Sequence, residues 1–256
     1  MIPIQVGGRP LAGGRLPAVC APLVARTHAA LAAETAAVAA RQPDLLEWRV
    51  DFFEAIGDPQ QVLGAAAAVR AASAGIPLLF TRRCQREGGQ PIALTEPQVL
   101  ALYEAVAASG SVDLMDFEMG NEPAHVAQAR ALTRRHGLPL VLSFHDFQGT
   151  PADDALRARF EQAHRMEGDV AKVAVMPRSM EDVHRLLGAT LQASRALPIP
   201  VVSMAMGGLG ALTRLCGGNF GSALTFAVGA SASAPGQIAI EEVRTTLAVL
   251  QRATLG

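Results

Sequence analysis

Lys172 is the residue whose type and surroundings most directly indicate chemistry. Of the 22 basic residues in this 256-residue chain, 21 are arginine, and Lys172 is the only lysine. A guanidinium stays protonated, so arginine cannot replace lysine where a neutral amine is needed. Lys172 lies in the apolar run DVAKVAV (169–175), where burial disfavours the ammonium form. The sequence therefore predicts a lysine that attacks a carbonyl to form a Schiff base; the structural alternative is a lysine that reaches solvent or pairs with a carboxylate.

His145 is the histidine best placed for proton transfer. It lies at the end of the apolar run LPLVLSFHD (138–146), whereas the other five histidines lie in predicted helices or at their ends. Histidine is the usual proton shuttle near neutral pH, although a histidine at a strand end can also serve only to bind a loop. Glu87 is a candidate to orient His145 or balance its charge, and the alternative for Glu87 is a solvated loop carboxylate.

Three arginines are candidates for binding an anion, because a guanidinium holds a carboxylate through two parallel hydrogen bonds. Arg214 ends the Gly-rich segment MGGLGALTR and has no acidic residue nearby in sequence, which favours anion binding. Arg49 lies within the run LLEWRVD between Glu47 and Asp51, and Arg83 ends the run PLLFTRR, which leads to Glu87. They can therefore bind substrate or pair with internal carboxylates such as Glu47 and Asp116.

These residues belong to a repeating pattern of short apolar runs and Ala-rich helical segments. The runs predict strands at 18–24, 45–51, 77–83, 112–119, 138–146, 169–175, 199–206 and 222–228. Helices are predicted at 28–41, 59–74, 96–109, 122–136, 152–166, 179–196, 208–216 and 238–252. Each strand and helix unit takes roughly 30 residues, the size of one βαβ step.

Eight such units predict an α/β fold, a single (β/α)8 TIM barrel over residues 1–256, with functional groups at the carboxyl ends of the strands. The opening IQVGGRPL is expected to form a short β-hairpin that closes the bottom of the barrel. An open doubly wound sheet is the competing fold. It would more often carry a Gly-rich loop after the first strand, where this chain reads ARTHAAL.

The composition excludes several classes of protein. A net charge of −1 argues against nucleic acid or an acidic membrane surface as a partner. Three cysteines without C-x-x-C spacing argue against a disulfide framework or a cysteine-zinc site and favour a reducing cytoplasm. No apolar run has the length of a membrane span, and the first residues lack a signal-peptide pattern. We therefore expect a cytoplasmic protein.

Three other functions remain compatible with these residues. An aldolase-like Schiff-base lyase would share Lys172 but would not need a carboxylate-binding Arg214. A metal-dependent sugar isomerase or epimerase would need ligands such as Glu47, Asp116, Glu118 and His145, although one histidine is few for such a site. A barrel without activity could also serve as a binding or scaffolding protein.

Six segments, in order along residues 17–240, carry a more specific signal: LLEWRVDFFE, LLFTRRCQREGG, VDLMDFEM, LSFHDFQGTP, GDVAKVAVMPRSMEDV and MAMGGLGALTRLCGGNFGSALTFAVGASASAPGQI. Together they resemble the type I 3-dehydroquinate dehydratases, Schiff-base enzymes of the shikimate pathway. The resemblance implies a homodimer that dehydrates 3-dehydroquinate to 3-dehydroshikimate with no metal and no organic cofactor. The segment CAPLVART lacks a glycine and a serine that some members show there, which puts a substrate contact from Ala21 in doubt.

The resemblance also implies roles for individual residues. Lys172 matches the Schiff-base lysine, His145 the general acid and base, and Glu87 its acidic partner. The segment SASAPGQ (231–237) is expected to act as a lid that excludes water. The implied substrate contacts are Glu47, Arg49 and Arg83 for the ring hydroxyls and their network, Arg214, Ser233 and Gln237 for the carboxylate end, and Met206, Phe226 and Ala234 around the ring and in the closing loop.

Overall fold

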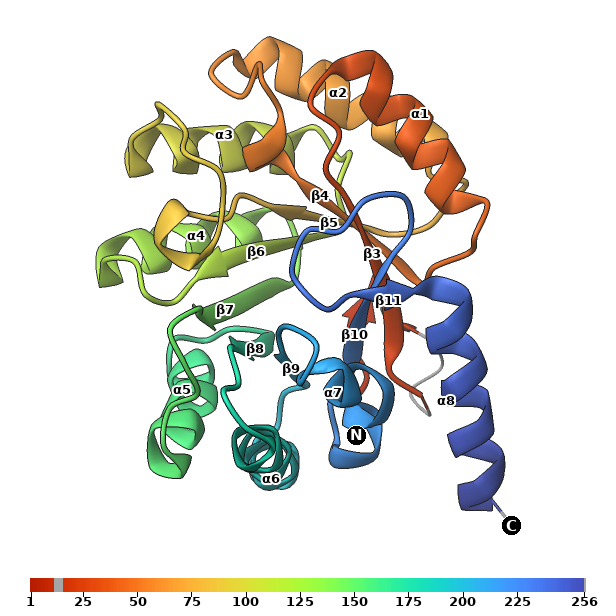
Figure 1. Cartoon of the computed structure of the whole chain (residues 1–256). Helices are drawn as coiled ribbons and strands as arrows, with labels where there is room; N and C mark the ends of the chain where they lie inside the picture. The colour runs from red at the N-terminus through yellow and green to blue at the C-terminus, as the bar shows by residue number, and fades with distance from the viewer. Residues whose placement is uncertain (12–15, 256) are drawn as a thin grey trace.

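The computed structural model describes residues 1–11 and 16–255, and its centre is a barrel of eight parallel strands (Figure 1). Their order along the sheet is β10, β3, β4, β5, β6, β7, β8 and β9. A parallel bridge between Val201 and Ser222, with a 2.8 Å hydrogen bond from the N–H of Ala223 to the oxygen of Val201, closes the sheet. The strands are β3 (Ala18–Leu23), β4 (Leu45–Arg49), β5 (Leu78–Thr81), β6 (Leu114–Glu118), β7 (Leu140–Asp146), β8 (Val170–Val175), β9 (Val201–Ala205) and β10 (Leu224–Val228).

A helix follows each of these strands and covers the outside of the barrel, so the predicted fold is confirmed. Asp58 accepts hydrogen bonds from the N–H groups of Gln60 and Gln61 and thereby caps the second helix, which begins with proline. Three short 3₁₀ segments, 50–52, 85–87 and 217–220, lie in the connections. The helices are α1 (His28–Ala39), α2 (Pro59–Ala72), α3 (Glu96–Ala108), α4 (Pro123–Arg135), α5 (Asp153–Arg165), α6 (Met180–Ala196), α7 (Ala211–Cys216) and α8 (Ile240–Leu255).

Several predicted boundaries are wrong: β4 ends at Arg49 and not at residue 51, β5 ends at Thr81 and not at residue 83, and α7 begins at Ala211 and not at residue 208. The sequence places residues 238 and 239 at the start of the last helix, but they form a short strand, β11 (Ile238–Ala239), parallel to β10. Ile238 pairs with Ala227, and Ala239 pairs with Val228. The loop after β10 returns alongside that strand before α8 begins, and sheet pairing at this point takes precedence over the helical pattern of the sequence.

The alternation of side chains along each strand separates two apolar clusters and determines which polar groups face inward. In β8, Ala171 and Val173 pack outward with the helices, whereas Val170 and Ala174 belong to the cluster inside the barrel. Because successive side chains of a strand point to opposite faces, Lys172 lies in the interior between these two inward residues. The same alternation in β4 places Glu47 inside and Trp48 outside.

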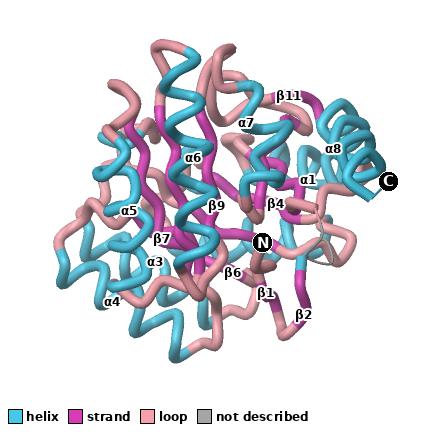
Figure 2. Tube along the Cα trace, turned by 90° about the horizontal axis from the view of Figure 1, so that it is seen from below, coloured by secondary structure: helices cyan, strands magenta, loops and turns pink. Residues whose placement is uncertain are grey.

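The predicted N-terminal hairpin is present. Strands β1 (Gln5–Val6) and β2 (Arg9–Pro10) pair antiparallel around two glycines with positive φ angles. Ile4 and Leu11 flank the hairpin and belong to the interior cluster of the barrel. The hairpin therefore closes one end of the barrel, and Figure 2 shows β1 and β2 at the end away from β11.

Candidate active site

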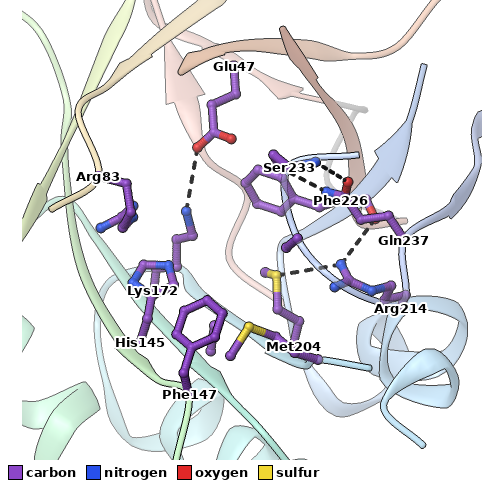
Figure 3. Close-up of a pocket in the computed structure, with 13 residues that line it drawn as sticks. Glu47, Arg83, His145, Phe147, Lys172, Met204, Arg214, Phe226, Ser233 and Gln237 are labelled. Carbon is purple, nitrogen blue, oxygen red and sulfur yellow. Dashed lines mark hydrogen bonds and ion pairs between the residues drawn. The ribbon is translucent and has the colours of Figure 1, made fainter. Parts of the chain in front are cut away.

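A cavity of about 410 Å³ lies at the carboxyl ends of the barrel strands (Figure 3). Ten of the twelve residues predicted for the site line it, and Arg49 and Glu87 do not. Phe147, Ala174 and Met204 also line it but were not predicted as site residues. The predicted residues that line the cavity are Glu47, Arg83, His145, Lys172, Met206, Arg214, Phe226, Ser233, Ala234 and Gln237.

Lys172 is buried, with 4% of its surface exposed, but its amine does not lie in an apolar environment. Its Nζ atom lies 3.1 Å from Oδ2 of Asp116 and 3.7 Å from Oε1 of Glu47. It also lies 4.6 Å from the centre of the Phe226 ring. The apolar neighbours seen in the sequence thus belong to the strand, whereas two other strands supply carboxylates. The amine therefore faces two carboxylates, and it must be in its neutral form when it attacks a carbonyl.

Arg83 joins these carboxylates into a buried network. Its Nη2 lies 2.7 Å from Oδ1 of Asp116, and its Nη1 lies 2.8 Å from Oγ of Ser143 and 3.1 Å from Oε1 of Glu118. Ser143 also donates a 2.7 Å hydrogen bond to Oδ1 of Asp116. Burial alone would raise the pKa of Asp116, but the charges of Arg83 and Lys172 lower this pKa to about 2. Asp116 is therefore a fixed anion.

His145 and Glu87 form a buried pair. Oε2 of Glu87 lies 2.9 Å from Nδ1 of the imidazole and accepts a second 2.9 Å bond from the backbone N–H of His145. Burial, together with Arg83, Lys172 and Arg49, lowers the pKa of His145 well below its ordinary value. Burial raises the pKa of Glu87 to about 7. The imidazole is thus neutral near pH 7, and an ionised Glu87 that accepts the Nδ1 proton leaves Nε2 as a free base.

Arg214 is a buried cation with no carboxylate partner in the described part of the chain. Only 1% of its surface is exposed, and its pKa is lowered by burial to about 10. Nη1 donates to the backbone oxygen of Phe226 at 3.3 Å, Nη2 donates to that of Pro235 at 3.1 Å, and the buried Nε has no hydrogen-bond partner. Because a buried charge is costly without a counterion, this arrangement indicates a binding site for an anion.

Close backbone packing explains one glycine of the Gly-rich segment before Arg214. A Cβ atom on Gly210 would lie 2.2 Å from the backbone oxygen of Ala205. Arg214 itself lies on α7 and reaches into the cavity, on the side opposite Lys172 in Figure 3.

With this geometry established, the family can be assigned. A family model described as type I 3-dehydroquinase matches residues 19–254.

The chain belongs to the type I 3-dehydroquinase family.

Proteins named 3-dehydroquinate dehydratase are similar to this chain over nearly its whole length. A 3-dehydroquinate dehydratase from Albidiferax ferrireducens is 55% identical over 98% of this chain and 95% of its own. The crystal structure of 3-dehydroquinate dehydratase from Geobacillus kaustophilus has a TM-score of 0.94 and 50% identity, covering 98% of this chain and 97% of that one. A type I 3-dehydroquinate dehydratase from Clostridium difficile, solved with covalently modified comenic acid, has a TM-score of 0.93 and 32% identity, covering 98% and 99%.

In this member of the type I 3-dehydroquinase family, the loop after β10 covers the cavity. The N–H of Ser233 donates to Oε1 of Gln237 at 2.9 Å, and Nε2 of Gln237 donates to Oγ of Ser233 at 3.3 Å. The N–H of Gly207 donates to the oxygen of Pro235 at 3.2 Å. Gly236 has a φ angle of +74°, and a Cβ atom there would lie 2.3 Å from the oxygen of Gly207. The closed position of the loop therefore requires glycine at 236.

Arg49, expected as a substrate contact, lies outside the cavity lining. Its Nε and Nη2 each lie 2.8 Å from an oxygen of Asp51, in a bidentate ion pair. Its Nη1 donates at 3.5 Å to the backbone oxygen of Ser233 in the closing loop. Glu87 also lies outside the cavity lining, and it contacts Nδ1 of His145. These two residues support the site, and only the three-dimensional structure separates them from the residues of the lining.

The predicted site did not include Asp116, Ser143 and Glu118, although the sequence offered Asp116 as an ion-pair partner for the arginines and Asp116 and Glu118 as ligands of an alternative metal site. A signal was present, since Asp116 and Glu118 alternate with the outward-facing Met115 and Phe117 along β6. Among the residues with described positions, no group of three His, Cys, Asp or Glu side chains could hold a metal ion. No helix within residues 1–11 and 16–255 combines the length and the apolar character needed to cross a membrane.

Proposed function

We propose that this protein is a hydro-lyase that converts 3-dehydroquinate into 3-dehydroshikimate through a Schiff base on Lys172. The observation that carries the proposal is that the amine of Lys172 and the unpaired guanidinium of Arg214 line one cavity. The substrate is a small ring that bears a ketone and a carboxylate, so it can engage both groups at once. The relatives named 3-dehydroquinate dehydratases support the same reaction and its place in the shikimate pathway.

The substrate carboxylate pairs with Arg214 and supplies the counterion that this residue lacks. The ring then rests against Phe226 and Met206, which line the same wall. The ring hydroxyls face Glu47 and Arg83 on the opposite side. Ser233 and Gln237 close over the carboxylate end, because the loop that carries them covers the cavity.

Schiff-base formation starts when the neutral Lys172 amine attacks the ketone carbon. The carbinolamine takes up one proton and loses water, and the product is an iminium ion that carries the positive charge on the nitrogen of Lys172. The iminium withdraws electrons from the neighbouring carbon 2 and makes its C–H bond acidic.

His145 carries the protons in the elimination. Its neutral imidazole takes the proton from carbon 2, and the electrons of that bond form an enamine. The enamine expels the hydroxyl group of carbon 1, which leaves as water after the imidazolium has returned the proton. The resulting conjugated iminium is hydrolysed to release 3-dehydroshikimate and free Lys172. Glu87 holds the imidazole in orientation throughout, through Nδ1.

Borohydride trapping tests the proposal. The protein is incubated with 3-dehydroquinate and sodium borohydride, and the adduct is located by peptide mass spectrometry. Because Lys172 is the only lysine, the N-terminal amine is its sole competitor as an amine nucleophile. We expect a substrate-derived mass on the peptide that holds Lys172, and none with Lys172→Met. A folded wild-type protein that dehydrates the substrate without an adduct, or that does not turn it over, would refute the proposal.

We further propose that residues 1–256 form a single domain that acts as a homodimer in the cytoplasm. The similarity to the family supports the dimer, and the three free cysteines fit a reducing compartment. Light scattering coupled to gel filtration measures the mass in solution. A monomer at the concentration of the activity assay would contradict the dimer.

A further inference from the structure

Asp116 is a buried carboxylate that the steps above do not use. It is fully buried, and its two oxygens have different partners. Oδ1 accepts hydrogen bonds from Arg83 and Ser143, both at 2.7 Å. Oδ2 lies 3.1 Å from Nζ of Lys172. One oxygen is thus fixed by two donors on neighbouring strands, and the other is directed at the atom that reacts.

The number of hydrogens on the Lys172 nitrogen differs between an ammonium and an iminium, although both carry one positive charge. An ammonium group has three N–H donors and can serve both Asp116 and Glu47. An iminium formed with a ketone has one N–H and can serve one carboxylate. The 3.1 Å contact to Asp116 is shorter than the 3.7 Å contact to Glu47. Glu47 also accepts a 3.0 Å hydrogen bond from Thr81 through the oxygen that faces Lys172.

We infer that Asp116 is the counterion of the Schiff-base cation and accepts its one N–H, and that Glu47 is thereby released to bind a substrate hydroxyl. The inference rests on the proposed function. It makes Asp116 a catalytic residue, because it contacts the reacting nitrogen. Glu47 then serves substrate binding.

This arrangement also orients the substrate ring. The N–H and the ring carbon occupy different directions around the planar C=N bond. With the N–H directed at Asp116 on β6, the ring is directed away from that strand, toward the side of the cavity that holds Phe226 and Arg214 (Figure 3). The contact therefore selects the iminium geometry that brings the carboxylate to Arg214.

Asp116 stays ionised through the cycle and exchanges no proton. Its pKa of about 2, which burial raises but Arg83 and Lys172 lower more strongly, keeps the carboxylate charged near pH 7. It faces a cation in the first iminium, a neutral enamine after the carbon 2 proton leaves, and a cation again in the conjugated iminium. The largest stabilisation therefore falls on the two iminium states.

The test compares Asp116→Asn with Glu47→Gln in steady-state kinetics and in borohydride trapping at saturating substrate. An asparagine can present its oxygen to Lys172 or to Arg83, but not a charge to either. We expect Asp116→Asn to lower both kcat and the trapped fraction, kcat by roughly 10- to 100-fold, the effect of losing a hydrogen bond to a charged group. We expect Glu47→Gln to raise KM and to leave the trapped fraction at saturation close to that of the wild type.

Two further variants keep the test decisive. Ser143→Ala removes one donor to Oδ1 of Asp116 and keeps the charge, so it should lower kcat and the trapped fraction in the same direction but by less than 10-fold. If Asp116→Asn does not fold, Ser143→Ala still tests the inference. Asp113→Asn is the control on the same segment, since Asp113 pairs with Arg70 and forms no ion pair with Lys172 within the described residues. It should leave kcat unchanged.

The outcomes separate this inference from the proposed function. No adduct on wild-type Lys172 would overturn both. A wild-type adduct together with an unchanged trapped fraction and kcat in folded Asp116→Asn would overturn the inference alone. So would a lower trapped fraction in Glu47→Gln than in Asp116→Asn, because Glu47 would then hold the iminium N–H.

Discussion

Replacing Arg214 with methionine should abolish substrate binding and make the protein more stable. The pKa of Arg214 falls from 12.5 to about 10 because the side chain is buried, a shift that corresponds to about 3 kcal/mol against the charged form. Since the folded-state pKa lies below the unfolded one, this cost is fully present near pH 7 and lessens only as the pH rises past about 10. Methionine has a similar volume and no charge.

Two lost hydrogen bonds offset part of the gain. The oxygens of Phe226 and Pro235 lose a donor, but that of Pro235 keeps the N–H of Gly207. We therefore expect Arg214→Met to raise the free energy of unfolding by about 1 to 2 kcal/mol, or Tm by a few degrees. The substrate carboxylate loses two charge-assisted bonds of about 1.5 to 3 kcal/mol each. This loss lowers kcat/KM by roughly 10²- to 10⁴-fold.

The assay pairs urea unfolding at pH 7 with the initial rate of enone absorbance. Arg130→Met is the matched control, because Arg130 has an ion pair with Asp169 at the other end of the barrel. We expect this control to be less stable than the wild type and equally active. An Arg214→Met protein with kcat/KM within about 3-fold of wild type, or with stability reduced by more than about 2 kcal/mol, would refute the reasoning.

Three further predictions follow from the same contacts. His145→Gln should lower kcat by about 10²- to 10⁴-fold, while borohydride still traps substrate on Lys172; loss of the adduct would contradict this division of roles. Because burial raises the pKa of Glu87 to about 7, activity should fall as the pH drops below that value, and Glu87→Gln should show low activity without this step. A raised folded-state pKa gives stability that is lost as the pH rises, so the wild type should lose up to about 3 kcal/mol relative to Glu87→Gln between pH 4.5 and about 7, measured by urea unfolding. Gly236→Ala should raise KM by at least about 10-fold and expose the loop 229–237 to proteases, because its Cβ would collide with Gly207; unchanged KM and protection would contradict the role of the closed loop.

The sequence alone was sufficient for the barrel. Its strands and helices alternate with local periodicities, and the N-caps and the apolar runs depend on residues close together in the chain. The hairpin at the bottom follows from a similarly local signal, two glycines between apolar residues. The short strand at Ile238 and Ala239 does not, because its hydrogen-bond partners lie on β10.

For the candidate site, too, the sequence determined one part and left another part open. The sequence identified Lys172, His145, Glu87, Arg49, Arg83 and Arg214 as candidates, and the family resemblance supplied the remaining predicted residues. The sequence proposed Glu87 as the partner of His145 but did not determine which carboxylate faces Lys172. Asp116 is 56 positions from Lys172, and Glu87 is 58 positions from His145.

Those partners were decided by tertiary structure. Closing the barrel brings the strand ends together, and the register of each strand determines which carboxylate faces the centre. Neither quantity is encoded by neighbouring residues, because a strand pairs with residues far along the chain and a shift of one residue turns every side chain to the opposite face. The residue types that can perform the chemistry can thus be identified from the sequence. The carboxylates that surround Lys172, and the lack of a carboxylate beside Arg214 among the described residues, arise only when the sheet closes.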